Sequence, residues 1–345
     1  MKHPAVSLFS GAGGLDVGVD KAGFKTLCSI ELDPHCVSTL RRNSRQKTVW
    51  QVDIRVLDPS RVAFSLGARR KDLALLYGGP PTQPVNQLGL KKGISHPQDH
   101  LALEMVRFAQ ALRPSAVLIA QAPRFLKTKY SPKALLKDVL AEEFKTIGYD
   151  LHQIVLDAVD YGIPQNRKQV FIVCLPRDQT YEFPYQVLLS APSTAEEAID
   201  GLPPAVKPEK DPGVPNHIDA TPPRDRVRIA YVREGDWLSK SDAPPDIIQK
   251  LTPRDSTKFR RLDRSLPAPT LRSGERLFHP VEDRYLTPRE TARIQGFEDR
   301  YVFHGPIRRL SGSVRDLDQH SQVANAVPPP FAQVIARSVK AALRL

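Results

Sequence analysis

The stretch AVSLFSGAGGLDVG, at residues 5–18, decides the fold of this chain of 345 residues. Its first half is short and apolar, which is typical of a buried strand. Its second half opens an amphipathic helix with Leu15, Val19 and Ala22 on one face. The glycines between them predict a turn that lets the backbone approach a ligand closely and points helix N–H groups at it.

Further apolar runs alternate with helical patterns along the first half of the chain. They lie at residues 26–30, 73–77 and 116–120, and each is bounded by glycine, proline or an acidic residue. Asp33 and Pro34 open a helix that reaches Asn43. Strands that are apolar on both faces and alternate with helices are typical of a parallel α/β sheet. We therefore predict an α/β, Rossmann-like fold.

The pattern changes near residue 176. Residues 184–270 contain many of the 32 prolines of the chain and no regular alternation of strand and helix, which predicts a smaller, irregular domain. Helical patterning returns at residues 287–295 and 330–345, and we expect the last helix to pack back onto the first domain. The expected division is therefore 1–176, 177–285 and 286–345.

Two acidic residues extend the ligand prediction. Glu31 ends the second strand, where a carboxylate can accept both ribose hydroxyls. Asp53 follows a third strand segment and could bind an adenine amino group, with Ile54 against the ring. The glycine turn alone is equally compatible with a tight strand–helix connection that binds nothing. Together with Glu31 and Asp53 it favours an adenosine-containing cofactor.

Five motifs, taken in order, resemble those of cytosine-C5 DNA methyltransferases. FSGAGGLD at residues 9–16 resembles their S-adenosylmethionine signature, GGPPTQP at 78–84 their catalytic turn, and DYGIPQNR at 160–167 their Gln-x-Arg-x-Arg segment. Residues 284–297 resemble the motif that supports the target-recognition region, and QVANAVPPP at 322–330 the motif that completes the cofactor pocket. The resemblance covers nearly the whole chain. It implies an S-adenosylmethionine-dependent methyltransferase sheet with a small, irregular target-recognition-like domain.

The resemblance also implies a reaction, from which this chain departs. The family flips a cytosine out of the duplex; a cysteine adds to C6, a glutamate protonates N3, and C5 takes the methyl group. Here Thr82 stands in the cysteine position, Gln121 in the glutamate position and Gln169 in the second arginine position. A threonine hydroxyl is far less acidic than a thiol with a pKa of about 8.5, and glutamine cannot deliver a proton. We expect C5 methylation to be lost.

The resemblance assigns residues of this chain to three roles. The family's catalytic positions are Thr82, Gln121 and Arg167. The residues matched to the cofactor pocket are Phe9, Ser10, Gly11, Ala12, Gly13, Gly14, Leu15, Glu31, Leu32, Asp53, Ile54, Pro80, Asn325 and Val327. The residues expected to contact nucleic acid are Gln83, Gln165, Arg167, Arg260 and Arg261.

The charge of the chain suits a polyanionic partner. Fifty Lys and Arg residues against 38 Asp and Glu give a formal net charge of +12, although a well-solvated surface explains that excess nearly as well. The small domain is short, whereas direct readout of DNA needs several side chains at base edges. We therefore expect weak or limited sequence specificity, and a compact reader around residues 242–264 remains an alternative.

The three cysteines point to a cytoplasmic protein, nucleoid-associated if bacterial. Cys28, Cys36 and Cys174 form neither a pairing pattern nor a metal-ligand spacing, so we expect a reducing compartment and no metal site. None of them stands near the missing nucleophile in the sequence. No apolar run is long enough for a membrane span and no signal-peptide pattern occurs, so we expect no membrane partner.

The leading hypothesis is a catalytically inactive member of the family, or pseudoenzyme. It would bind S-adenosylmethionine or S-adenosylhomocysteine and DNA, and act as a DNA-binding or regulatory subunit. Its protein partner could be an active methyltransferase or a nuclease, or it could self-associate, in restriction or phage defence.

Three alternatives stay open. The first is an active DNA- or RNA-modifying enzyme with altered chemistry, which the retained cofactor motifs favour. The second is half of a split enzyme whose partner supplies the nucleophile, although one chain carries all the motifs. The third, a nicotinamide-dependent enzyme, is the most distant because the glycine turn departs from the dinucleotide fingerprint.

Overall fold

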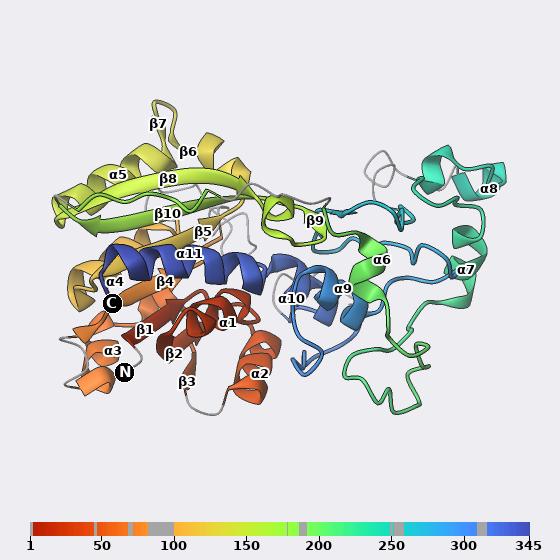
Figure 1. The fold of residues 1–345 in the computed structure, drawn as a ribbon, viewed down its shortest axis with the longest axis horizontal. Coiled ribbons are helices and arrows are strands. Elements are labelled where there is room, and N and C mark those ends of the chain that lie inside the picture. The colour runs from red at the N-terminus through yellow and green to blue at the C-terminus, as the bar shows by residue number, and fades with distance from the viewer. Residues whose placement is uncertain are drawn as a thin grey trace.

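The computed structural model describes most of the chain. The described residues are 3–44, 47–67, 72–81, 100–177, 179–185, 192–248, 251, 259–308 and 316–345. They form a layered α/β part built on one large sheet and a less regular part beside it (Figure 1). Thr82 and Gln83, expected at the catalytic turn, lie outside the described residues.

The central sheet has seven strands in the order β3-β2-β1-β4-β5-β10-β8. The first five are parallel to one another, whereas β10 runs antiparallel to both of its neighbours. The strands are β1 (His3–Leu8), β2 (Phe24–Glu31), β3 (Thr48–Gln51), β4 (Leu75–Gly78), β5 (Ala116–Gln121), β8 (Tyr149–Asp157) and β10 (Lys168–Pro176). The predicted α/β sheet is confirmed, and it is mostly rather than wholly parallel.

The antiparallel edge has a simple cause. Only residues 158–167 separate β8 from β10, and a parallel crossover needs a dozen or more residues, usually including a helix. The short connection holds a 3-10 turn, η6 (Ala158–Tyr161), and the two-residue strand β9 (Gln165–Asn166). The strands around it therefore pair as antiparallel neighbours.

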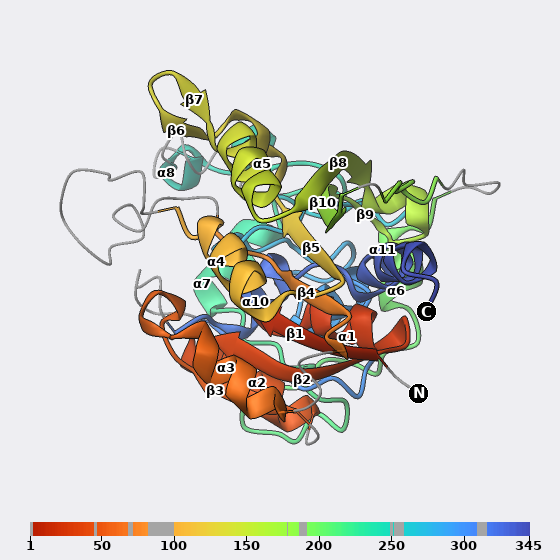
Figure 2. The same cartoon turned by 90° about the vertical axis from the view of Figure 1, so that its left-hand side faces the viewer.

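Helices cover both faces of the sheet (Figure 2). One face packs against α3 (Pro59–Leu66), α4 (Leu103–Leu112) and α5 (Leu136–Thr146), and the other against α1 (Gly14–Lys21) and α11 (Pro329–Ala342). Both interfaces are built from strand side chains that alternate between the two faces. The remaining elements of this part are α2 (Pro34–Asn43), η1 (Ile54–Val56), η5 (Pro123–Lys127), β6 (Lys129–Ser131) and β7 (Ala134–Leu135).

The strands and helices expected near the glycine turn are present within a few residues of their predicted bounds. The apolar runs correspond to β1, β2, β4 and β5, and the first two predicted helices to α1 and α2. The helix α2 begins at Pro34, and the Asp33 side chain accepts a hydrogen bond from the Cys36 N–H at 2.9 Å. An aspartate cap followed by proline is a strong helix start, which explains why the sequence predicted this boundary.

The irregular part lies between β10 and the last helices, at the right of Figure 1. Its helices and strands are short: α6 (Ala195–Ile199), α7 (Pro223–Ile229), η7 (Leu238–Lys240), α8 (Pro245–Ile248) and β11 (Ala268–Pro269). A separate small core holds it together, with Ile229, Leu238 and Phe278 fully buried. The strand β11 pairs with β9, which ties this part to the large sheet.

The chain then returns to the large part through α9 (Pro288–Ile294), α10 (Gln319–Asn325) and α11. The expected helices at 287–295 and 330–345 are confirmed as α9 and α11, and α11 packs on α1 as expected. Among the described residues, every helix falls short of the length and apolar character that a membrane crossing requires. The same residues contain no cluster of three or more His, Cys, Asp or Glu side chains that could hold a metal ion.

Candidate active site

The glycine turn after β1 is conformationally unusual. Phe9 and Gly13 both have positive φ, 53° and 86°, a region that non-glycine residues adopt rarely and at a cost. Such backbone strain is commonly found at functional sites. Gly11 faces open space, because a Cβ built on it would meet no atom within 4 Å. The turn therefore leaves its Gly11 side open to a ligand.

The other side of the turn is closed by the end of the chain. A Cβ on Gly14 would overlap the Val327 carbonyl oxygen, and one on Gly13 would lie 2.6 Å from the Tyr301 hydroxyl. The Tyr301 hydroxyl donates a hydrogen bond to the Ala12 carbonyl at 2.5 Å. Val327 is thus beside the glycine turn, as the family motif implied.

Glu31 is hydrogen bonded to the turn itself. Its Oε2 accepts from the Gly11 N–H at 2.7 Å, and its Oε1 accepts from Leu32 N and Asp33 N, each at 2.8 Å. Burial raises the pKa of Glu31, while these three hydrogen bonds oppose the rise. Each carboxylate oxygen has two lone pairs, so the group can also accept from ribose hydroxyls.

Asp53 makes local contacts in this structure. Its side chain caps η1 through the Arg55 N–H at 3.1 Å and pairs with Arg55 Nε at 2.9 Å. An adenine amino group would share this carboxylate with Arg55. The segment after Asp53 is held by Arg107, whose guanidinium donates to the Ile54 carbonyl at 2.6 Å and to the Leu57 carbonyl at 2.9 Å. Sequence reasoning did not single out Arg107.

A buried ion pair involves Asp16, in the helix that follows the glycine turn. Lys47 Nζ lies 2.5 Å from Asp16 Oδ2, and the two side chains are 4% and 2% exposed. Ser7 and Ser29 donate hydroxyl hydrogen bonds to the same carboxylate at 2.7 and 2.8 Å. The ion pair and the two hydrogen bonds offset the free-energy cost of removing the Asp16 carboxylate from water. Sequence reasoning missed the pair because a lysine between polar residues is usually at the surface.

Gln121, at the end of β5, is buried and binds the neighbouring turn. Its Nε2 donates a hydrogen bond to the Pro80 carbonyl at 2.8 Å. A carboxylate in this position could not donate that bond and would repel the carbonyl oxygen. The glutamine is therefore matched to the backbone of the Gly79–Pro80 segment, which precedes Thr82 in the sequence.

Arg167 joins three segments of the chain. Its guanidinium donates to the Leu271 carbonyl at 3.2 Å and to the Ala324 carbonyl at 3.0 Å, and its backbone N–H donates to Asp157 Oδ1 at 2.8 Å. No carboxylate within the described ranges forms an ion pair with it. Burial lowers the pKa of Arg167 to about 10. The group therefore presents a positive charge balanced only by carbonyl dipoles.

Gln169 lies on β10 beside the strand of Gln121. Val170 pairs with Gln121 across the two strands, so Gln169 is one residue away from that position. Its Oε1 is buried and has no hydrogen-bond partner within the part of the chain that the structure describes. An unpaired buried acceptor is uncommon in native proteins and costs stability.

The residues expected to contact nucleic acid differ in their surroundings. Gln165 is fully buried, and its Nε2 donates to Gln295 Oε1 at 2.5 Å. Arg261 is also buried and pairs with Asp283 at 2.5 Å. Arg260 is half-buried, and its guanidinium carbon lies 4.4 Å from the centroid of the Trp237 ring. Of these three side chains, Arg260 is the one that lines a cavity.

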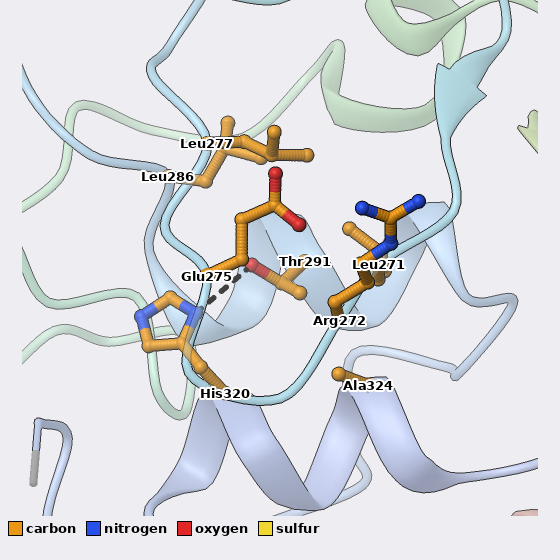
Figure 3. A pocket seen from close by; sticks show the side chains of 8 residues that line it. All are labelled: Leu271, Arg272, Glu275, Leu277, Leu286, Thr291, His320 and Ala324. Carbon is orange, nitrogen blue, oxygen red and sulfur yellow. Dashed lines mark hydrogen bonds between the residues drawn. The ribbon is translucent and has the colours of Figure 1, made fainter. Parts of the chain in front are cut away.

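Two cavities lie at the irregular part. The smaller, of about 10 Å³, has room for about one water molecule and is lined by residues of α9, α10 and the segment before them (Figure 3). In it Thr291 Oγ1 lies 3.2 Å from His320 Nδ1. The larger, of about 630 Å³, is the size of a ligand site. We call it the Trp237 groove, and its polar and aromatic walls are Asn166, Trp237, Lys240, Arg260, Thr270, Arg272 and Glu275. Neither cavity is lined by the glycine turn.

The cofactor-matched residues gather at the carboxyl ends of β1 and β2. Gly11 and Glu31 are hydrogen bonded to each other, and Val327 closes the opposite side of the turn. Asn325 is exposed two residues before Val327, and Pro80 follows β4, the other neighbour of β1. Ser10, Ala12 and Leu32 belong to the loops after β1 and β2, whereas Leu15 lies in the first turn of α1 and Ile54 opens η1 after β3.

Comparison with known proteins agrees with these motifs. A family model for C-5 cytosine-specific DNA methylase matches residues 4–341. The type II methyltransferase M1.HphI of Haemophilus parahaemolyticus is 30% identical over 97% of this chain and 86% of its own length. M.DdeI of Desulfomicrobium norvegicum is 29% identical over 97% of this chain and 88% of its own length.

Solved structures share the fold. A prophage-encoded protein of E. coli, assigned as a DNA modification methyltransferase, superposes with a TM-score of 0.73 at 22% identity, over 100% of both chains. DNMT2 of Spodoptera frugiperda superposes with a TM-score of 0.60 at 14% identity, over 98% of this chain and 99% of its own. This chain and these proteins therefore share a fold although their sequence identity is low.

Proposed function

The chain belongs to the C-5 cytosine-specific DNA methylase family, and from that premise we propose that it binds S-adenosylmethionine and DNA without methylating cytosine at C5. The family uses S-adenosylmethionine as its methyl donor. We propose that residues 1–176 and 286–345 form the cofactor-binding part and residues 177–285 the target-recognition-like domain. The role we assign to the protein is that of a DNA-binding or regulatory subunit.

The observation that carries the proposal is the replacement of the nucleophile by Thr82. A threonine hydroxyl is almost wholly protonated at neutral pH, and no adjacent base takes its proton in the family mechanism. Gln121 adds a second obstacle, since its amide is hydrogen bonded to the Pro80 carbonyl and has no acidic proton for N3. Both the attack on C6 and the activation of the ring are thereby lost.

A third replacement, at Gln169, keeps the net charge of the site unchanged. Gln121 removes a negative charge and Gln169 a positive one, so the net charge of these positions together with Arg167 stays as in the family pattern. Because Val170 rather than Gln169 pairs with Gln121, the two side chains leave opposite faces of the sheet, and the compensation is one of net charge rather than of a direct ion pair. The paired loss supports a protein kept stable for binding rather than for catalysis.

The cofactor side supports retained binding. The glycine turn, its hydrogen-bonded Glu31 and the closing Val327 are all present. These groups have no part in the attack on cytosine, so selection for cofactor binding alone accounts for their survival. We assign the ribose to Glu31 and the adenine to Asp53 and Ile54.

A cofactor titration and a transfer assay test the proposal. S-adenosylmethionine and S-adenosylhomocysteine should bind in calorimetry, and radioactive methyl transfer to DNA should be absent. Thr82→Cys combined with Gln121→Glu and Gln169→Arg should gain transfer above the level of Thr82→Cys alone. Transfer by the natural chain that disappears in Thr82→Ala would overturn the proposal.

The second candidate function is modification of DNA or RNA by another reaction. The retained cofactor side favours it, because a pure scaffold has no need of a methyl donor. Mass spectrometry of nucleosides after incubation with DNA or RNA separates the two. A new modified nucleoside would establish the second function, and an unchanged profile supports the first.

The partner is proposed from the relatives. M1.HphI and M.DdeI are type II methyltransferases, so we propose an active methyltransferase or a nuclease as the partner. A pull-down from a host that carries such a system should recover one of them. Self-association, read from sedimentation of the purified chain, is the competing outcome.

A further inference from the structure

The Trp237 groove holds three cations and one carboxylate, Glu275, at its walls. The guanidinium carbon of Arg260 lies 4.4 Å from the centroid of the Trp237 ring, and Lys240 Nζ lies 4.8 Å from it. Arg272 lines the same cavity and is exposed. The groove adjoins β9, because Asn166 and Thr270 also line it and the Thr270 hydroxyl donates to the Asn166 carbonyl at 2.5 Å.

The positions of these cations are fixed by the backbone. Trp237 and Arg260 face each other across an antiparallel bridge, and the next N–H, of Leu238, donates to the Phe259 carbonyl at 2.8 Å. Lys240 belongs to the 3-10 turn that begins after Trp237. A cation over an aromatic face is attracted to it, so the ring holds both charged groups in place before any ligand arrives.

The three groove cations differ from other cations of the same part in having no acidic partner. Arg233, Arg261 and Arg264 are paired with Asp242, Asp283 and Glu234 at 2.9, 2.5 and 2.9 Å. Within the described residues, no carboxylate lies within 4.0 Å of the charged nitrogens of Lys240, Arg260 or Arg272. Their charge is therefore available to an external anion.

Arg260 also carries an unused donor. Its Nε is buried and has no acceptor within the described part of the chain. Because Nε is buried, contact with an external phosphate falls to the terminal N–H groups, which a guanidinium stacked on an aromatic ring keeps in its plane. Leu266, Pro267 and Pro269 add an apolar part to the wall, which suits a sugar between two phosphates, and Glu275 occupies the remaining position.

We propose that the Trp237 groove binds adjacent phosphates of one DNA strand, held by Arg260, Lys240 and Arg272. This inference rests on the proposed DNA binding and names the surface responsible for it. Contacts from Lys and Arg to phosphate carry no base information, so the groove fixes the position of the strand without reading its sequence. One of its lining residues, Asn166, stands between Gln165 and Arg167 in the sequence, and this connects the groove to the reaction side of the site.

The first test measures the salt dependence of binding. A fluorescent duplex of about 20 base pairs is titrated at several salt concentrations, and log K is plotted against log salt. Lys240→Gln, Arg260→Gln and Arg272→Gln should each weaken binding and make the slope shallower by about one. Two duplexes of different sequence should give the same change, and single-stranded DNA or RNA of equal length should bind more weakly than duplex.

Matched controls separate the two levels of the proposal. Arg233→Gln removes a cation of the same part that is already paired, and Lys25→Gln removes an exposed one at the start of β2. Both should leave the slope unchanged, with melting temperatures confirming that every variant folds. A natural chain that fails to bind duplex contradicts the proposed function. If the natural chain binds duplex but the groove variants and the control variants give equal salt slopes, the DNA binding stands and the assignment of that binding to the groove is contradicted.

The second test uses the tryptophan itself. The chain has two tryptophans, so Trp50→Phe leaves Trp237 as the single reporter, and its emission should change when duplex is added. Trp237→Leu keeps all three charges but releases two of them, and should weaken binding about tenfold while changing the salt slope less than a charge variant does. Unchanged emission together with unchanged affinity would overturn the proposal.

Discussion

The two sides of the candidate site differ in how their polar groups are satisfied. On the cofactor side, Glu31 accepts three backbone hydrogen bonds, and Asp16 is paired with Lys47 and bound by two serine hydroxyls. On the reaction side, Gln169 keeps an unpaired buried oxygen, and the Arg167 guanidinium has no acidic partner among the described residues. The polar groups of the first arrangement are hydrogen bonded or paired, whereas the second contains a buried oxygen and a buried cation without such partners among the described residues.

The largest expected effect falls on the cofactor side. Lys47→Met leaves Asp16 buried without its partner and should lower the free energy of unfolding by about 3–5 kcal/mol. Urea denaturation measures the change. The double variant Asp16→Asn with Lys47→Met should regain a large part of the loss, and an equal loss in both would show that packing rather than charge is responsible.

The next effect concerns cofactor affinity. Glu31→Ala removes the acceptor assigned to the ribose and should weaken S-adenosylmethionine binding about 100-fold, which corresponds to two charge-assisted hydrogen bonds. Calorimetry at equal protein concentration measures it. Gln121→Ala, on the reaction side, should change this affinity by less than about twofold. Equal losses in the two variants would remove the division between the sides.

A smaller effect is expected from restoring one charge on the reaction side. Gln121→Glu places a carboxylate against the Pro80 carbonyl and should destabilise the fold by about 1–3 kcal/mol at neutral pH. The loss should shrink as pH falls and the carboxylate is protonated. Adding Gln169→Arg should recover part of it, and chemical denaturation of the single and double variants completes the cycle.

The smallest effect is a gain. Gln169→Leu removes the unpaired Oε1 and should raise the free energy of unfolding by about 1 kcal/mol, with cofactor binding unchanged. Thermal melting detects a shift of this size. A loss of stability instead would mean that the amide has a partner in the folded protein, and the contrast between the two sides would then weaken.

Much of the fold follows from local patterns. Strands β1, β2, β4 and β5 are buried on both faces, so their continuous apolar runs could be recognised, and the cap and proline of α2 fixed where that helix begins. The antiparallel β10 was not predicted, because its direction depends on the length of the connection from β8 rather than on its own residues.

The site shows the limit of motif matching. A motif says which residue stands at a position but not what its side chain binds, so Gln165 was assigned to nucleic acid although it donates to Gln295 inside the protein. Arg260 and Arg261 are adjacent and chemically identical, yet one lines a groove and the other pairs with Asp283. The irregular backbone around the two arginines decides which side chain lines the groove and which one forms the ion pair.

The contact between Gly14 and Val327 has a consequence for synthesis. The residue that closes the glycine turn is made more than 300 residues after the turn itself. A nascent chain, or a fragment cut in the irregular part, holds the turn and Glu31 without the opposite wall. On the proposed function, S-adenosylmethionine would stabilise only chains that have been made through residue 327, so the ligand would distinguish these chains from shorter ones.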